Sequence, residues 1–262
     1  MNKKRGQLTI FLIMLFVILI AVVFILSLNK KEAKSFTETE VKKELSIDDI
    51  NVRSFVEKCV EKTGKEALFY LGFLGGRLKP DAFEKYYSYD EKLKIPYFYF
   101  DGENKIPLPY DEGYWTNLLD RYINDNLAKC TNNFRSFEGL KVEHGNVRAK
   151  TEFTDEEVIF NLDFPVAIIR DFKKNNLEPD YIYSVKLRLR DILETVTTIV
   201  EQEVNNDKYI HWDYLTDVTN KNYNITAYTE SDNTIIYRII DLENKIDDEY
   251  YYFQFANKIK AK

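Results

Sequence analysis

Apolar residues fill positions 8–28 without a charge, and only Thr9 and Ser27 interrupt these 21 positions. A helix of this length rises about 30 Å, which matches the hydrocarbon core of a bilayer. Backbone polar groups in lipid must be hydrogen-bonded internally, so the segment has to be helical. Residues 25–30, Ile-Leu-Ser-Leu-Asn-Lys, lack the small-x-small pattern of a secretory cleavage site. The pattern therefore predicts a permanent transmembrane helix over residues 7–28.

Basic residues flank this helix on both sides. Three lie in the tail 1–6 and five follow the helix: Lys3, Lys4 and Arg5, then Lys30, Lys31, Lys34, Lys42 and Lys43. A count of Lys and Arg near the span places the C-terminal part of the chain in the cytoplasm. The opposite orientation avoids moving the short basic tail across the membrane. We expect this second orientation, a single-pass protein of the cell membrane with its C-terminal domain outside.

Three later segments show the periodicity of amphipathic helices, with apolar residues three or four positions apart. The first follows a charged stalk or linker, 29–47; Asp48 or Asp49 caps it, and it ends at the glycine-rich 72–76. Its apolar face is expected to contain Ile50, Phe55, Val56, Cys59, Val60, Ala67, Leu68 and Leu71. The second helix is expected over about 111–131, and the third begins at about Lys186 or Leu189 and ends at Val204.

Alternating apolar and polar residues between turn signals predict the strands. One strand is expected at 95–100. The next three form an antiparallel meander with one solvent-exposed face, at 140–143, 147–150 and 158–164. The last three close the chain, at 223–229, 234–240 and 250–255. Helices and antiparallel strands in separate runs favour an α+β fold. We therefore expect one α+β domain over 48–262, with a possible weak sub-boundary near 175–180.

The charge balance changes the list of partners. The chain has 37 basic and 43 acidic residues, so its net charge is −6. Removing Lys3, Lys4 and Arg5 leaves 34 basic against 43 acidic residues, a net charge of −9 for the rest. Because nucleic acid attracts a basic surface, we expect no nucleic-acid partner. The expected partners are the lipid bilayer, through residues 7–28, and membrane or surface proteins, including further copies of the chain.

Cys59 and Cys130 are the only two cysteines, and both fall on the apolar face of a predicted helix. In an oxidising compartment they can form a disulfide, which would stabilise the fold by about 4 kcal/mol through loop entropy. Two ordinary buried thiols are the alternative. An extracytoplasmic domain favours the disulfide.

Few residues offer chemistry. His144 and His211 are the only two histidines, and His211-Trp212-Asp213 is by itself a weak sign of an acid/base pair. The glycine-rich 71–77 lacks the ending of a phosphate loop. The acidic segments 230–233 and 247–249 are expected to be exposed turns and not calcium sites. We therefore expect no enzyme, no metal and no cofactor.

Two surface features remain. Asn224, Ile225 and Thr226 form an acceptor sequon for glycosylation in an exported chain. The 19 Tyr and 18 Phe residues admit two interpretations. They can form a recognition surface, because aromatic residues favour interfaces. They can also reflect codon bias of an A+T-rich genome, since they are spread along the whole chain.

The start of the chain resembles a known signal. Residues 3–9, Lys-Lys-Arg-Gly-Gln-Leu-Thr, run directly into the apolar helix and resemble the class III signal of archaeal type IV pilin-like proteins. The resemblance implies cleavage between Gly6 and Gln7, with the apolar helix kept on the mature protein. The chain departs from the family at Phe11, where many such pilins have a glutamate needed for assembly.

The remainder is similar to uncharacterised single-pass surface proteins of small-genome archaea. Three segments carry this similarity: Phe-Val-Glu-Lys-Cys at 55–59, Leu-Gly-Phe-Leu-Gly-Gly at 71–76 and Tyr-Phe-Gln-Phe-Ala at 252–256. The sequence thus predicts a non-enzymatic, membrane-anchored surface protein with a structural, adhesive or complex-forming role. The alternatives are a minor pilin-like subunit processed after Gly6 and a membrane-anchored enzyme of unrecognised class.

Overall fold

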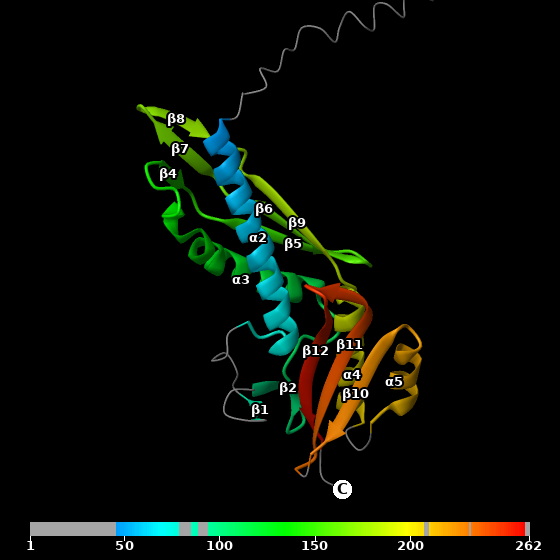
Figure 1. Cartoon of the computed structure of the whole chain (residues 1–262). Helices are drawn as coiled ribbons and strands as arrows, with labels where there is room; N and C mark the ends of the chain where they lie inside the picture. The colour runs from blue at the N-terminus through cyan, green and yellow to red at the C-terminus, as the bar shows by residue number, and fades with distance from the viewer. Residues whose placement is uncertain (1–45, 79–84, 89–93, 207–209, 231, 260–262) are drawn as a thin grey trace, which may run out of the picture. The chain divides into compact units, whose positions relative to one another are not determined.

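The structure is a computed structural model that describes residues 46–78, 85–88, 94–206, 210–230 and 232–259 (Figure 1). Ile47–Lys262 form one compact unit, and the sub-boundary expected near 175–180 falls inside it. No helix among the described residues is both long enough and apolar enough to cross a membrane. The tail 1–6, the predicted span 7–28 and the Gly6–Gln7 bond lie outside the described residues.

The fold is α+β, as the two periodicities predicted. The described helices are α2 (Ile47–Phe73), α3 (Glu112–Thr131), the short 3-10 helix η2 (Asn132–Phe134), α4 (Leu189–Asn205) and α5 (Trp212–Thr219). The described strands are β1 (Tyr86–Ser88), β2 (Lys94–Phe100), β3 (Glu103–Asn104), β4 (Lys141–His144), β5 (Arg148–Phe153), β6 (Glu157–Asp163), β7 (Val166–Arg170), β8 (Lys173–Asn176), β9 (Asp180–Lys186), β10 (Tyr223–Thr229), β11 (Thr234–Ile246) and β12 (Glu249–Lys258).

The strands form three sheets. The largest has the order β1-β2-β12-β11-β10, with β3 added to β2, and its β12–β2 pair is parallel. The other two have the orders β4-β7-β8 and β5-β6-β9, and all their pairs are antiparallel. The C-terminal end of the chain is therefore joined to an early strand, which ties the two halves of the unit together.

The predicted meander is wrong in its pairing. β4 pairs with β7, whereas β5 pairs with β6, so residues 144–146 join two sheets and do not form a hairpin turn. The cause is β7, whose apolar run the alternation pattern did not detect. β7 is buried over its first three residues, Val166, Ala167 and Ile168, and it supplies the apolar partner of β4.

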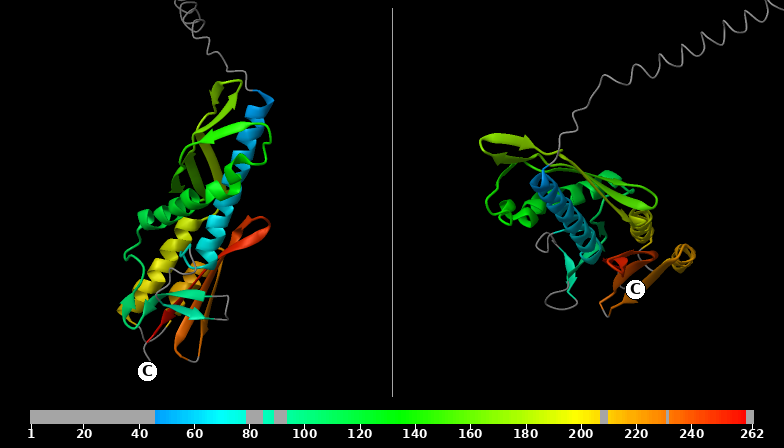
Figure 2. Two further views of the ribbon diagram at one scale, coloured as in Figure 1. Left: turned by 90° about the vertical axis from the view of Figure 1, so that its left-hand side faces the viewer. Right: turned by 45° about the horizontal axis from the view of Figure 1, so that its top comes forward.

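Helix α2 is the longest of the described helices, and it packs against α3, β9 and β12. It begins at Ile47, so Asp48 and Asp49 lie in its first turn and not at its cap. Its buried face contains Val52, Val56, Cys59, Val60, Ala67, Leu68 and Leu71. Ile50, which we expected on this face, is 53 % exposed. Both views in Figure 2 show α2 beginning beside the β7–β8 hairpin and ending near the β11–β12 hairpin.

Glycine lets the end of α2 approach the large sheet closely. A Cβ atom on Gly72 would lie 2.1 Å from the Tyr252 carbonyl oxygen, which no side chain can tolerate. Gly76 follows the helix with φ +77°, a left-handed conformation that glycine adopts without cost. The glycine-rich 72–76 is therefore a packing and termination signal, as the sequence predicted.

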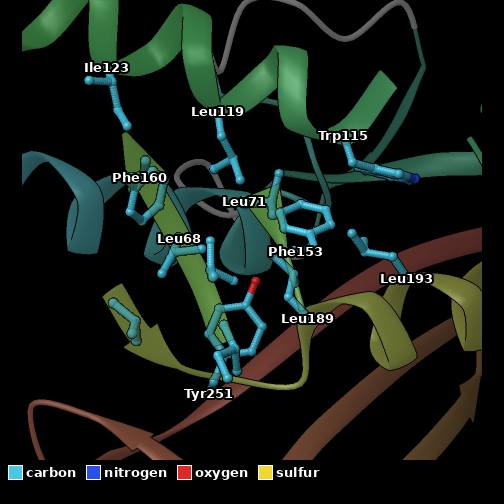
Figure 3. Close-up of a cluster of buried hydrophobic side chains, with 14 of the residues drawn as sticks. Leu68, Leu71, Trp115, Leu119, Ile123, Phe153, Phe160, Leu189, Leu193 and Tyr251 are labelled. Atoms are coloured by element: carbon cyan, nitrogen blue, oxygen red, sulfur yellow. The ribbon is translucent and has the colours of Figure 1, made fainter. Parts of the chain in front are cut away.

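The core is continuous across helices and sheets (Figure 3). Leu68 and Leu71 of α2 meet Trp115 and Leu119 of α3, and strands of two sheets and α4 complete the cluster with Phe153, Phe160, Leu189, Leu193 and Tyr251. Cys59 and Cys130 join α2 to α3 as a disulfide, with 5.6 Å between their Cα atoms. The two helices that the sequence predicted are thus linked covalently.

Helix side chains also cover the edges of the β5-β6-β9 sheet. On α3, Asp120 accepts a hydrogen bond from the Thr151 amide at 2.7 Å, and Asn124 accepts one from the Ala149 amide at 2.9 Å. On α2, Arg53 donates hydrogen bonds to the Glu178 carbonyl, just before β9, and to the Asp180 carbonyl, at the start of β9. Because exposed strand edges promote unwanted pairing, these contacts protect the sheet.

Candidate functional site

A groove lies between the C-terminal half of α2 and the β11–β12 hairpin. It encloses about 320 Å³ and is open to solvent on one side. Most of its lining is apolar and aromatic, and its lining residues are Lys65, Glu66, Phe69, Tyr70, Ile246, Asp247, Glu249, Tyr250, Tyr251 and Tyr252. The groove thus combines one helix with a hairpin almost two hundred positions away in the sequence.

The hairpin reaches the helix through a tight turn. Asp247 and Asp248 have φ values of 50° and 69°, and Ile246 pairs with Glu249, so the loop has two residues in left-handed conformations. Such turns match the twist of the strands that they join. The β11–β12 register shifts between Ile240 and Lys245, which separates this tip from the regular sheet.

A lysine clamps the tip of the hairpin to α2. Lys65 Nζ lies 2.6 Å from Asp247 Oδ1 and 2.7 Å from Glu61 Oε1. The hydrogen bond to Asp247, followed by that to Glu61, raises the pKa of Lys65 above its usual range. The charged ammonium group thus links the hairpin to α2 and holds one wall of the groove against the other.

The rim of the groove presents aromatic rings to solvent. Phe69 is 50 % exposed on α2, and Tyr250 is 48 % exposed on β12. Phe69 stacks on Phe73 with 5.5 Å between the ring centroids and contacts Tyr70 edge to face. At the base, Tyr251 is buried, and burial raises the pKa of its hydroxyl. Exposed aromatic clusters of this kind are typical of interaction sites.

The charges of the lining are predominantly negative. Lys65 is the one basic residue among the described lining residues, and Glu66, Asp247 and Glu249 are acidic. Lys65 already bonds to Asp247, and Glu66 Oε1 lies 3.9 Å from Lys62 Nζ on the exposed side of α2. The carboxylates of Glu66 and Glu249 and the hydroxyls of the lining tyrosines are polar groups that a ligand can reach. Ring faces and carboxylates together can hold a molecule that has a flat apolar side and hydrogen-bond donors or a positive charge.

A second polar cluster lies in the core, away from the groove. Glu203 of α4 is buried; it accepts hydrogen bonds from the Tyr237 hydroxyl and, at 2.5 Å, from Asn257 Nδ2. Asn257 Oδ1 in turn accepts from the Tyr99 amide at 3.0 Å. Burial raises the pKa of Glu203 to about 7, although the hydrogen bonds from Tyr237 and Asn257 act in the opposite direction.

The histidines lie apart from the groove. His144 ends β4 and contacts the rings of Phe134 and Phe164. His211 precedes α5, and Asp213 lies in the first turn of that helix. Neither histidine lines the groove, and within the described ranges no group of three or more His, Cys, Asp and Glu residues could hold a metal ion.

The other predicted surface features also have defined places. Asn224 is exposed on β10, the strand that ends the large sheet, so the sequon remains a candidate for glycosylation. The acidic segments take part in ion pairs: Asp232 binds Lys258 at 2.8 Å, and Asp247 binds Lys65. Both lie at hairpin turns, as expected.

Sequence reasoning missed the groove. The sequence does contain one sign of it, because Phe69 and Tyr70 lie off the buried face of α2. Two adjacent aromatic rings exposed on a helix indicate an interaction site. No family model matches the chain, and neither a curated protein nor a solved structure is similar to it. The groove must therefore be interpreted from its own geometry.

Proposed function

We propose that the protein is a non-enzymatic, membrane-anchored surface protein whose unit 47–262 is a binding module with an adhesive or complex-forming role. The observation that carries this proposal is the aromatic groove, which α2 and the β11–β12 hairpin form and which Lys65 holds in place. Its ligand is a molecule or surface group with a flat apolar face and hydrogen-bond donors.

The anchor and the side of the membrane rest on two other observations. Positions 8–28 have the length and composition of a transmembrane helix. The disulfide between Cys59 and Cys130 supports an extracytoplasmic unit, because disulfides persist in oxidising environments and are rare in the cytosol. The first observation supports the anchor, and the disulfide favours the orientation with tail 1–6 inside.

A pilin-like subunit is the second candidate, and residues 3–9 are the observation that favours it. It differs from the first candidate by cleavage between Gly6 and Gln7 and by assembly through residues 7–28. Intact mass of the protein extracted from native membranes without reductant separates the two. A complete N-terminus with an oxidised cysteine pair supports the permanent anchor, whereas loss of residues 1–6 supports the pilin-like subunit. Recovery in the soluble fraction would refute both.

The binding role has its own test. The full chain is reconstituted in liposomes, and its adhesion to the envelope fraction of the native host is measured by flotation. We expect Phe69→Ala combined with Tyr250→Ala to reduce adhesion strongly, because both remove ring faces from the groove. Tyr228→Ala is the matched control, since Tyr228 is equally exposed but lies on β10. Equal adhesion of all three proteins would exclude the groove as the binding site.

A further inference from the structure

The tip of the β7–β8 hairpin presents a fully exposed aromatic ring. Phe172 is 105 % exposed, and it stands beside Asp171 in a two-residue turn between paired Arg170 and Lys173. The φ values are 44° at Asp171 and 65° at Phe172. Turns of this type favour Asn-Gly, and a bulky residue in the left-handed region is a rare exception. A strained conformation that holds an apolar group in solvent indicates a functional contact.

Side-chain contacts fix this hairpin to the beginning of α2. Arg170 Nη2 lies 2.9 Å from Asp48 Oδ2 and 3.4 Å from Asp49 Oδ1. Asn175 donates a hydrogen bond to Asp49 Oδ2 at 2.7 Å. The Asp49 side chain is buried by these contacts. The hairpin and the first turn of α2 therefore form one end of the unit, as Figure 1 also shows.

This end carries further exposed apolar residues. Ile47 is 78 % exposed and Ile50 is 53 % exposed, and both lie in the first turn of α2. The charged groups nearby are balanced, with four basic and four acidic side chains: Lys141, Arg170, Lys173 and Lys174 against Asp48, Asp49, Glu143 and Asp171. This balance gives no strong attraction to a charged surface, so the exposed apolar side chains are the feature of this end that can support a contact.

The chain enters the unit at the same end. Ile47 follows the predicted transmembrane helix by only the 18 residues of 29–46, which span at most roughly 60 Å. A covalent tether of this length keeps the unit near the bilayer at a high effective concentration. The anchor has already paid the loss of translational entropy on binding to the membrane. A few exposed apolar side chains are therefore enough to hold the tethered unit on the bilayer.

We propose that Phe172, Ile47 and Ile50 form a bilayer-contacting face on which the unit stands. This inference rests on the membrane anchor of the proposed function and adds an orientation to it. In this orientation the groove is displayed away from the membrane, because its α2 residues, Lys65 to Tyr70, lie about 27–35 Å along the helix from Ile47. The lipid interface is the occupant, and aromatic and aliphatic side chains are the residues that insert there.

The test uses tryptophan as a probe in the full chain, reconstituted in phosphatidylcholine liposomes with brominated acyl chains. In a Trp212→Phe background, Phe172→Trp places a tryptophan at the hairpin tip, and Trp115 stays buried in the core. We expect the bromolipids to quench this tryptophan about twofold, as for a ring inserted about 5–10 Å into the interface. Tyr250→Trp, in the same background, is the control at the groove, and we expect no quenching there.

The outcomes separate the inference from the anchor. Protein that fails to float with the liposomes overturns the membrane anchor itself. Protein that floats, but whose hairpin-tip tryptophan is quenched by aqueous iodide and not by bromolipid, overturns the bilayer contact alone. A tryptophan at this position that is protected only in native membranes assigns the face to a protein partner and likewise overturns it. Equal bromolipid quenching at positions 172 and 250 refutes the orientation.

Discussion

Replacing Glu203 by glutamine should make the protein more stable at neutral and alkaline pH. Glu203 is buried on α4, and its hydrogen-bond partners, Tyr237 and Asn257, are both neutral. No cation among the described residues pairs with the carboxylate, so burial is the main cause of its raised pKa. Glutamine reproduces the protonated acid, because its oxygen can accept from Asn257 and its amide can donate to the Tyr237 oxygen.

The size of the effect follows from the shift in pKa. The pKa of Glu203 rises from 4.5 to about 7 on folding, so the native state binds a proton that the unfolded state releases. The contribution of Glu203 to the free energy of unfolding is therefore fully present below about pH 4.5. It falls as pH rises toward 7, and the total loss is about 3 kcal/mol. Glu203→Gln avoids this loss. We expect equal stabilities at pH 4.5 and an advantage of about 3 kcal/mol for the variant at pH 8.

The assay is urea unfolding of the full chain in detergent micelles, followed by far-ultraviolet circular dichroism at several pH values between 4.5 and 8. Comparison of variant with wild type at each pH cancels the titration of all other groups. Glu194→Gln is the control, because Glu194 is exposed on the same helix. A stability difference that does not change with pH, or a variant less stable than wild type at pH 8, would refute the reasoning.

Three further outcomes follow from the fold. Replacing both Cys59 and Cys130 by serine should lower the free energy of unfolding by about 4 kcal/mol, measured by urea titration, because the disulfide closes a loop with a sequence separation of 71. Asp171→Asn with Phe172→Gly should raise it by about 1 kcal/mol in the same titration, since both residues are left-handed. Gly72→Ala should lower the melting temperature markedly in calorimetry, because its Cβ would clash with a carbonyl of β12. An unchanged free energy of unfolding in the first two variants, or an unchanged melting temperature in the third, would contradict the corresponding expectation.

Helices α2, α3 and α4 could be predicted because their burial follows the helical period, whereas the short α5 was not predicted. In α3, Trp115, Leu119, Ile123 and Leu127 are all buried, and each is four positions from the next. This spacing identifies a helix and its inner face from the sequence alone. The disulfide followed from the same reasoning, since both cysteines lie on the inner faces of two predicted helices. These features depend on local periodicity, and the sequence contains it directly.

The pairing of the strands could not be predicted in the same way. A strand such as β4 shows only alternation, and alternation does not say which strand it pairs with. β7 and β8 were not predicted at all: β7 reads as a short apolar run, and β8 is polar throughout. Glu203 did leave a signal, because it follows Ile199 and Val200 on the inner face of α4. A carboxylate on a buried helical face indicates a polar cluster in the core.

Helix α2 connects the groove to the proposed bilayer-contacting face. At its first turn Asp49 binds Asn175 of the β7–β8 hairpin, and near its end Lys65 binds Asp247 of the β11–β12 hairpin. Between these two contacts, Cys59 links the helix covalently to α3. A helix held at both ends and near its middle cannot tilt without breaking one of these contacts. The length of α2 therefore fixes the separation between the proposed bilayer-contacting face and the groove.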